Sequence, residues 1–255
     1  MKSRVLFLAD INSPHTQKWA ISLAEKNFEI GIFSFNHSDL KWMASTKNIV
    51  CLRQAKEKQL NNPFSKLKYL LLLLRLFIVI LKFRPHIMHV HYASSYGLLG
   101  ALTFYKPLII SAWGSDLTEF PDKSWLHKYI IKFVLWRADK ICVSSTLLQR
   151  EVKKYSKKPS VIIPFGIDFT SFYKPKNSSL PHTFTFGCVK PLEKHYNIDK
   201  VVVTFSLLIK HYPKSNLRLK LVGDGMMRDR IFLRAKQLRL LSLIEFTGWV
   251  EHQFV

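Results

Sequence analysis

The sequence contains few cysteines. The three present, Cys51, Cys142 and Cys188, are far apart, and none is part of a Cys-x-x-Cys motif. An odd and scattered set of cysteines does not indicate a disulfide framework, and it fits a reducing cytoplasm. Cys142 and Cys188 each lie in a short apolar run, so we expect them to be small core residues.

Acidic residues are also scarce. The chain carries 17 Asp and Glu against 39 Lys and Arg, which gives a net charge of +22. Solubility alone does not require such an excess, so we expect an anionic partner: nucleic acid, a phosphorylated ligand or anionic lipid headgroups. Because the sequence has no zinc-finger, helix-turn-helix or RNA-binding signature, we expect no nucleic acid and attribute the charge to phosphate and lipid.

Long uninterrupted apolar runs are few, and we expect neither a signal peptide nor a membrane span. The start of the chain, MKSRVLFLAD, turns polar after about six residues, which is too short for a signal peptide. The most apolar segment, Leu67–Phe83, contains Arg75, and 13 residues separate Lys68 from Lys82 where a span needs roughly 20. Two interpretations stay open: a helix packed on a sheet, or a helix in the membrane interface with its basic residues at the headgroups.

What the sequence does contain is a regular succession of strands and helices. Apolar residues make up 48%, enough for a sizeable core, and neither a repeat nor a low-complexity tract is present. The alternation predicts an α/β fold with a parallel sheet. The expected strands are Val5–Leu8, Glu29–Ser34, Ile49–Leu52, His86–His91, Leu108–Ala112, Lys140–Val143 and Ser160–Pro164, and the expected helices are His15–Lys26, Pro63–Phe83, Tyr96–Phe104, Trp125–Arg137 and Ser145–Tyr155.

A change in composition divides the chain. Residues 173–182, YKPKNSSLPH, have little apolar content and are predicted to be a linker between an amino-terminal domain, 1–172, and a second domain, 183–255. A doubly wound domain has roughly five or six strands, so three predict that the second domain is incomplete. Its expected elements are strands Thr183–Val189, Leu217–Val222 and Leu243–Thr247 and helices Asn197–Tyr212 and Arg228–Leu240.

Ligands of open parallel sheets bind at the carboxyl ends of strands, and the first strand is followed by polar residues. Asn12, Ser13 and His15 lie where a helix is expected to begin, and backbone N–H groups at such a position can hold an anion. The alternative is an ordinary N-cap by Ser13, with Pro14 at the first helical position.

Two later strand ends in this domain also carry candidate residues. Because side chains alternate along a strand, His89 and His91 share one face. No carboxylate or cysteine lies near them, so we expect no metal site; we expect one core histidine and one, His91, that faces a ligand. After the next strand, Gly114 permits a tight backbone path to Asp116, and the alternative is a helix cap by Ser115 or Asp116.

The second domain offers two candidate positions for an anionic ligand. Lys190 and Lys194 follow its first strand, and two lysines four residues apart can hold a diphosphate as point charges. Gly223 and Gly225 form a Gly-x-Gly at the end of the next strand, which is a weak signal when it stands alone.

In order along the chain, eight stretches resemble the retaining family 4 glycosyltransferases. These are SPHTQKWA, HIMHVHYASSYGLLGAL, SAWGSDL, RADKICVSS, VIIPFGIDFTSF, VKPLEKHYNID, LVGDG and IEFTGWV. Enzymes of that family have the GT-B fold, in which an amino-terminal Rossmann-like domain holds the acceptor and a second one holds the nucleotide-sugar donor. The resemblance implies a GT-B-like α/β fold with a complete first domain and a partial second domain.

The resemblance also implies roles for single residues. The family's basic pair, which binds the donor diphosphate, falls on Lys190 and Lys194. The donor nucleotide side would include Gly166, Gly223 and Gly225, and the acceptor side would include Asn12, Ser13, His15, His91, Gly114 and Asp116. The sequence departs from the family pattern at Phe165, where the family's turn has asparagine, and at Trp113, where many members have histidine. Because Trp113 replaces that histidine, no catalytic residue is assigned. The sequence also lacks the pair of glutamates that relatives carry beyond IEFTGWV.

From these observations we expect a glycosyltransferase of the hexosyltransferase type. It would move a sugar from a nucleoside diphosphate sugar to a saccharide or lipid-linked acceptor in polysaccharide or glycolipid synthesis, with retention and with neither metal nor cofactor. We expect it in the cytoplasm, peripheral at the inner face of the cell membrane, with an anionic membrane surface as partner. The alternative is a truncated, inactive relative that only binds a nucleotide or an acceptor.

Overall fold

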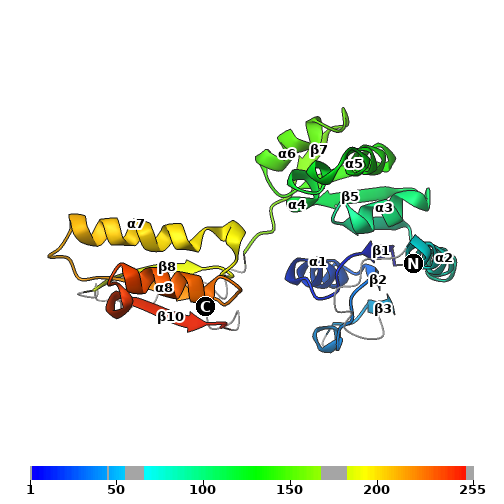
Figure 1. The fold of residues 1–255 in the computed structure, drawn as a ribbon. Coiled ribbons are helices and arrows are strands. Elements are labelled where there is room, and N and C mark those ends of the chain that lie inside the picture. The colour runs from blue at the N-terminus through cyan, green and yellow to red at the C-terminus, as the bar shows by residue number, and fades with distance from the viewer. Residues whose placement is uncertain (1, 45, 55–65, 168–182, 251–255) are drawn as a thin grey trace. The chain divides into compact units, whose positions relative to one another are not determined.

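The computed structural model of this chain describes residues 2–44, 46–54, 66–167 and 183–250. The chain divides into two compact units, unit 1 (1–166) and unit 2 (167–255), and each unit has its own sheet (Figure 1). The predicted linker, 173–182, lies outside the described residues, so the proposed domain boundaries remain a prediction.

Unit 1 contains a seven-stranded sheet in the order β3-β2-β1-β4-β5-β6-β7, and every pairing is parallel, as predicted. Reversal of the strand order on either side of β1 is the arrangement of doubly wound α/β folds. The strands are β1 (Arg4–Leu8), β2 (Glu29–Phe33), β3 (Ile49–Arg53), β4 (Ile87–His91), β5 (Leu108–Ala112), β6 (Lys140–Val143) and β7 (Ser160–Ile162).

Helices cover both faces of this sheet (Figure 1). Alternation along β1 divides the core: Val5 and Phe7 pack on the side of α1, whereas Leu6 and Leu8 pack with α2, α3 and α5. The helices are α1 (Pro14–Glu25), α2 (Lys66–Phe83), α3 (Ser95–Leu102), α4 (Ser115–Thr118), α5 (Trp125–Arg137) and α6 (Thr146–Lys153), with short 3-10 turns at Lys41–Met43 and Pro121–Lys123.

Helix α2 packs on the sheet through one face only. Leu72, Leu76 and Phe83 are buried, whereas Leu74 and Leu81 are 54% and 73% exposed. The helix therefore lies on the sheet, as the first interpretation of this segment expects, but its other face is open. No helix within the described residues is both long enough and apolar enough to cross a membrane.

The end of α2 lies directly on β2 because Gly31 has no side chain. A Cβ at Gly31 would lie 2.5 Å from Leu52 Cδ1 and 2.9 Å from the ring of Phe83. Contacts that short do not occur in folded proteins, so only glycine allows Phe83 to sit this close to the strand.

Unit 2 has a smaller parallel sheet with the order β10-β9-β8. Leu219 and Leu221 of β9 face a core shared with both helices, whereas Lys220 between them pairs with Glu245 on the other face. One face of this sheet is thus covered by helices and the other carries charge. The elements are β8 (Phe184–Val189), α7 (Ile198–His211), β9 (Leu217–Val222), α8 (Arg228–Gln237) and β10 (Ile244–Gly248), with 3-10 turns at Lys194–Tyr196 and Leu241–Leu243.

Candidate functional site

Three loops at the carboxyl edge of the unit 1 sheet bring aromatic side chains together. The His15 ring stacks on Phe165 with centroids 3.7 Å apart, and it meets Trp113 edge-on at 5.5 Å. Trp113 and Phe165 are themselves 5.4 Å apart. The two positions at which the sequence departs from the family pattern are therefore in mutual contact, and both contact a predicted acceptor-side residue.

His89 and His91 lie on one face of β4, as alternation predicted, with ring centroids 4.6 Å apart. Both are buried, so the expected contrast between a core histidine and a ligand-facing one is absent. His89 Nε2 is 2.8 Å from Ser111 Oγ, and His91 Nδ1 is 3.2 Å from Thr16 Oγ1. The Nε2 of His91 has no hydrogen-bond partner among the described residues.

Burial determines the charge of this pair. It lowers the pKa of His89 to about 4, and it lowers the pKa of His91 well below the ordinary value. Both rings are therefore neutral near neutral pH. Within the part of the chain that the structure describes, no cluster of three or more His, Cys, Asp or Glu side chains is placed to hold a metal ion.

Asp116 is fully buried and binds backbone rather than solvent. Its carboxylate accepts hydrogen bonds from the N–H groups of Ala93, Trp113 and Gly114, at 2.7, 3.1 and 2.8 Å. Burial raises its pKa, although these amide hydrogen bonds oppose the shift. The cap of α4 is Gly114, so the alternative of a helix cap by Ser115 or Asp116 is wrong. Asp116 instead holds the loops after β4 and β5 together.

The loop after β1 is held in place by its own contacts. Ser13 precedes Pro14 at the start of α1, as the N-cap alternative expects, but its side chain makes no capping hydrogen bond. The Asn12 side chain donates to the carbonyl oxygen of His37 at 2.7 Å. Asn12 is therefore tied to the loop after β2, and its acceptor-side role stays a prediction.

A cavity of about 200 Å³ opens beside the ring stack, lined by His15, Lys18, Trp19, Ser22, Pro164 and Phe165. Burial lowers the pKa of His15, and the neighbouring Lys18 charge lowers it further. Gly166 has a φ of 66°, and a Cβ there would lie 3.6 Å from Lys18 Nζ. The predicted donor-side Gly166 thus lies beside Lys18, and it follows Phe165, which stacks on the predicted acceptor-side His15.

In unit 2 the loop after β8 packs on the turn after β9. Lys190 N–H donates to the Val222 carbonyl and Leu192 N–H to the Asp224 carbonyl, both at 3.0 Å. Gly223 and Gly225 have φ of 138° and 159°, and a Cβ would lie 2.2 Å from the Lys190 carbonyl oxygen and 2.7 Å from that of Leu192. Both glycines are required for this close approach.

The two predicted clamp lysines are exposed at this edge. Lys190 Nζ lies over the Tyr196 ring, 5.4 Å from its centroid, and Lys194 begins the 3-10 turn that precedes α7. Neither lysine forms an ion pair within the described residues. The nearest acidic groups are otherwise engaged: Glu193 accepts a hydrogen bond from the Met226 N–H, and Asp224 pairs with Arg228.

Three further residues, Thr16, Lys18 and Ser111, contact or border the predicted site and were not among the predicted site residues. Ser111 carried a usable signal, because it is a polar residue within an otherwise apolar strand. Thr16 and Lys18 lie within a helix that the sequence predicted, but their neighbours come from β4 and from residues 164–166. No local pattern reveals such contacts.

A family model described as glycosyl transferase 4-like matches residues 4–145. No curated protein matches the sequence significantly.

Among solved structures, sucrose-phosphate synthase from Thermosynechococcus elongatus has a TM-score of 0.77 and 14% identity over 99% of this chain and 72% of that chain. Anabaena HepE in complex with UDP and glucose has a TM-score of 0.68 and 16% identity over 97% and 69%. The lipopolysaccharide outer core galactosyltransferase WaaB has a TM-score of 0.64 and 14% identity over 100% and 70%. At such identities these likenesses concern the fold, and they confirm the predicted GT-B-like α/β class.

Proposed function

The chain belongs to the glycosyl transferase 4-like family, and from this premise we propose that it moves a sugar from a nucleoside diphosphate sugar to a saccharide or lipid-linked acceptor. The proposal includes a hexose as the transferred sugar, retention of configuration, and a role in polysaccharide or glycolipid synthesis. Because HepE is described in complex with UDP and glucose, UDP is the first nucleotide to test.

The observation that carries the proposal is the strand edge of unit 2. Backbone hydrogen bonds fix the Lys190–Glu193 loop on the Gly223–Gly225 turn, and the two lysine side chains remain exposed beyond it. A departing nucleoside diphosphate carries negative charge, and fixed cations at that position stabilise the transition state. Lys190 and Lys194 would supply this charge without a metal ion, assisted by the N-terminus of α7.

We propose that the acceptor binds at the carboxyl edge of the unit 1 sheet. Its surroundings would be the loop of Asn12, Ser13 and His15, the buried His91, and the loop that Asp116 holds in place through Gly114. A neutral His91 ring can accept a proton or a hydrogen bond, but no residue here is assigned as a catalytic base.

A lipid-linked acceptor lies in a membrane, so the enzyme would have to reach the membrane surface. The open face of α2 carries Leu74, Ile78 and Leu81 with Arg75 and Lys82 beside them. An amphipathic helix of this kind binds the headgroup region of an anionic bilayer. We therefore propose a cytoplasmic enzyme that is peripheral at the inner face of the cell membrane.

The test begins with the donor. Lys190→Ala combined with Lys194→Ala should weaken UDP or GDP binding by at least about tenfold for each lysine, because hydrogen bonds to charged groups are worth about 1.5–3 kcal/mol. Isothermal titration calorimetry measures this, and Lys214→Ala with Lys236→Ala is the control for removing two exposed lysines from the same unit. An unchanged dissociation constant would refute the donor assignment.

Transfer is tested separately from binding. The rate of sugar transfer from UDP-glucose or a related donor to added acceptors should also fall in the Lys190→Ala, Lys194→Ala variant. If UDP binds tightly and no donor supports transfer to any saccharide or lipid-linked acceptor, the alternative of a relative that only binds its ligands is favoured.

A further inference from the structure

Helix α5 exposes a row of aromatic side chains. Trp125, Tyr129 and Trp136 are 72%, 62% and 62% exposed, and their spacing of four and seven residues puts them on one side of the helix. Leu126, which is also exposed, follows Trp125 and borders the row, and Phe104, from the turn after α3, is 60% exposed next to its far end. These five residues are called the α5 face. Large aromatic side chains gathered on one surface mark an interaction site.

The charged residues of helix α5 itself are all basic. Lys128 and Lys132 are exposed between the aromatic residues, and Lys132 Nζ lies 5.6 Å from the centroid of the Tyr129 ring. Helix α5 contains no acidic residue. A partner of this surface therefore has to offer apolar contact and negative charge together.

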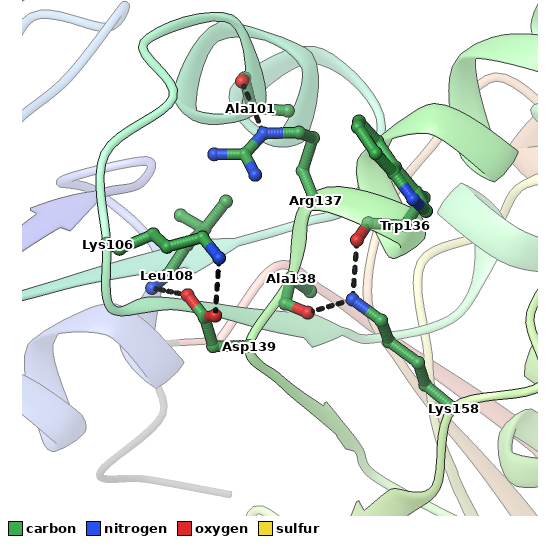
Figure 2. A network of polar contacts seen from close by, with 8 residues as sticks. All are labelled: Ala101, Lys106, Leu108, Trp136, Arg137, Ala138, Asp139 and Lys158. Carbon is green, nitrogen blue, oxygen red and sulfur yellow. Dashed lines mark hydrogen bonds and ion pairs between the residues drawn. The ribbon is translucent and has the colours of Figure 1, made fainter.

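Contacts of Arg137 and Lys158 fix the carboxyl-terminal end of α5, and Figure 2 shows their hydrogen bonds. The guanidinium of Arg137 lies 4.6 Å from the Phe104 ring centroid and 5.8 Å from that of Trp136, and its Nε donates to the Ala101 carbonyl. Lys158 Nζ donates to the carbonyl oxygens of Trp136 and Ala138, so the end of α5 is fixed to the segment before β7. The backbone that carries Trp136 is thus fixed before any partner binds.

The α5 face belongs to the same layer as the open face of α2. Both helices contact α3 and pack on the same side of the unit 1 sheet, as Figure 1 shows. Their exposed residues therefore point away from the same face of the sheet. The outer surface of this layer combines leucine, isoleucine and aromatic side chains with Arg75, Lys82, Lys128 and Lys132.

We propose that the α5 face is a second membrane contact, which lies against an anionic bilayer together with α2 and inserts Trp125, Tyr129 and Trp136 at the headgroup level. Tryptophan and tyrosine with flanking lysines are enriched at the membrane interface. A second copy of the chain fits less well, because it would bring Lys128 and Lys132 against an equally basic chain of net charge +22. The inference rests on the proposed function only in that a lipid-linked acceptor requires the enzyme at a membrane.

The experiment uses the whole chain and two kinds of vesicle. Mixed phosphatidylcholine and phosphatidylglycerol vesicles should bind the protein, and phosphatidylcholine vesicles should bind it weakly. With lipids brominated on the acyl chains, bound protein should show quenched tryptophan fluorescence. Trp125→Phe with Trp136→Phe should remove most of the quenching, whereas Trp249→Phe should not, although Trp249 in unit 2 is exposed to the same extent at 73%.

Charge is tested by Lys128→Glu with Lys132→Glu. Because a basic residue near an anionic bilayer contributes about 1 kcal/mol, partitioning should fall by about fivefold or more for each lysine. Lys214→Glu with Lys236→Glu, two exposed positions in unit 2, is the control for the same change in net charge, and it should have a smaller effect.

Three outcomes would overturn the inference. Quenching that survives Trp125→Phe with Trp136→Phe, while Leu74→Glu with Ile78→Glu abolishes binding, would leave α2 as the contact and exclude α5. Absence of binding to the mixed vesicles would exclude both. Concentration-dependent dimerisation that Trp125→Glu abolishes, without vesicle binding, would assign the face to a second copy. Transfer to a soluble acceptor, assayed in parallel, tests the proposed function independently of all three.

Discussion

The two units use the same succession of strands and helices but bury their sheets to different extents. In unit 1 the central strands β1 and β4 lie between two layers of helices and are almost wholly buried. In unit 2 both helices lie on one face, and the edge strand β8 exposes Phe184, Phe186 and Val189. An apolar groove of about 910 Å³ runs beside β8 and α7, lined in part by Phe186, Leu207 and Tyr212.

Parallel sheets are normally covered on both faces, because their strands are apolar on both. Unit 1 therefore has an extensive core on both faces of its sheet, whereas unit 2 depends on a smaller core and on close backbone packing at its strand edge. Three experiments test this difference between the two units.

The largest effect is expected from Gly223→Ala. The added methyl group would lie 2.2 Å from the Lys190 carbonyl oxygen at a φ of 138°, so unit 2 should lose about 3 kcal/mol or more of stability. Hydrogen exchange resolved by mass spectrometry should show this loss in unit 2 and leave unit 1 unchanged. Gly187→Ala is the control, because a Cβ there meets nothing within 4 Å. Equal losses in the two variants would contradict the close packing at the strand edge.

A smaller effect should appear in unit 1 as the pH falls. Burial lowers the folded-state pKa of His89 from 6.5 to about 4. Between these values the unfolded chain binds a proton that the folded unit does not, so stability is present above pH 6.5 and falls by up to about 3 kcal/mol towards pH 4. His91 acts in the same direction.

The loss is measured as the difference in the free energy of unfolding of unit 1 between neutral pH and about pH 5. Urea unfolding monitored by hydrogen exchange gives this free energy at each pH. His89→Gln should reduce the pH dependence, whereas His211→Gln, at an exposed position in unit 2, should not. An undiminished pH dependence in His89→Gln would mean that other groups cause the acid sensitivity.

The smallest effect is expected for the ion pair on the open face of the unit 2 sheet. Lys220 Nζ and Glu245 Oε1 are 2.8 Å apart, but the side chains are 44% and 60% exposed. Lys220→Met should therefore cost less than about 1 kcal/mol. A cost of several kcal/mol in chemical denaturation would mean that this face is covered in solution, and the contrast between the units would fail.

Much of the fold could be predicted because the central strands β1, β4 and β5 are short and mainly apolar, whereas the main helices are longer and mix apolar with polar residues. The expected ranges of β5, β6 and α5 coincide with the observed ones. The short helix α4 was not predicted, because its geometry depends on Asp116 binding the N–H of Ala93 in another loop. Contacts across 23 residues leave no local pattern.

The candidate site could be predicted less well than the fold. Alternation correctly put His89 and His91 on one face, but their burial depends on α1, whose Thr16 and Trp19 come from 75 and 70 residues away. The α5 face was missed for a different reason: α5 is apolar on most sides, so its sequence does not distinguish the buried Ile131 and Leu135 from the exposed Trp136. Roles for Lys190, Lys194 and the three glycines remain predictions.

Gly31 has a consequence for a surface that it never touches. A Cβ at Gly31 would lie 2.9 Å from the ring of Phe83, so this position limits how closely the last turn of α2 approaches the sheet. A methyl group at Gly31 would have to displace that ring, and Leu81 and Lys82 belong to the same turn of the helix. The angle at which the protein meets a flat partner can therefore change through a residue on the concealed side of the helix, with every exposed side chain kept the same.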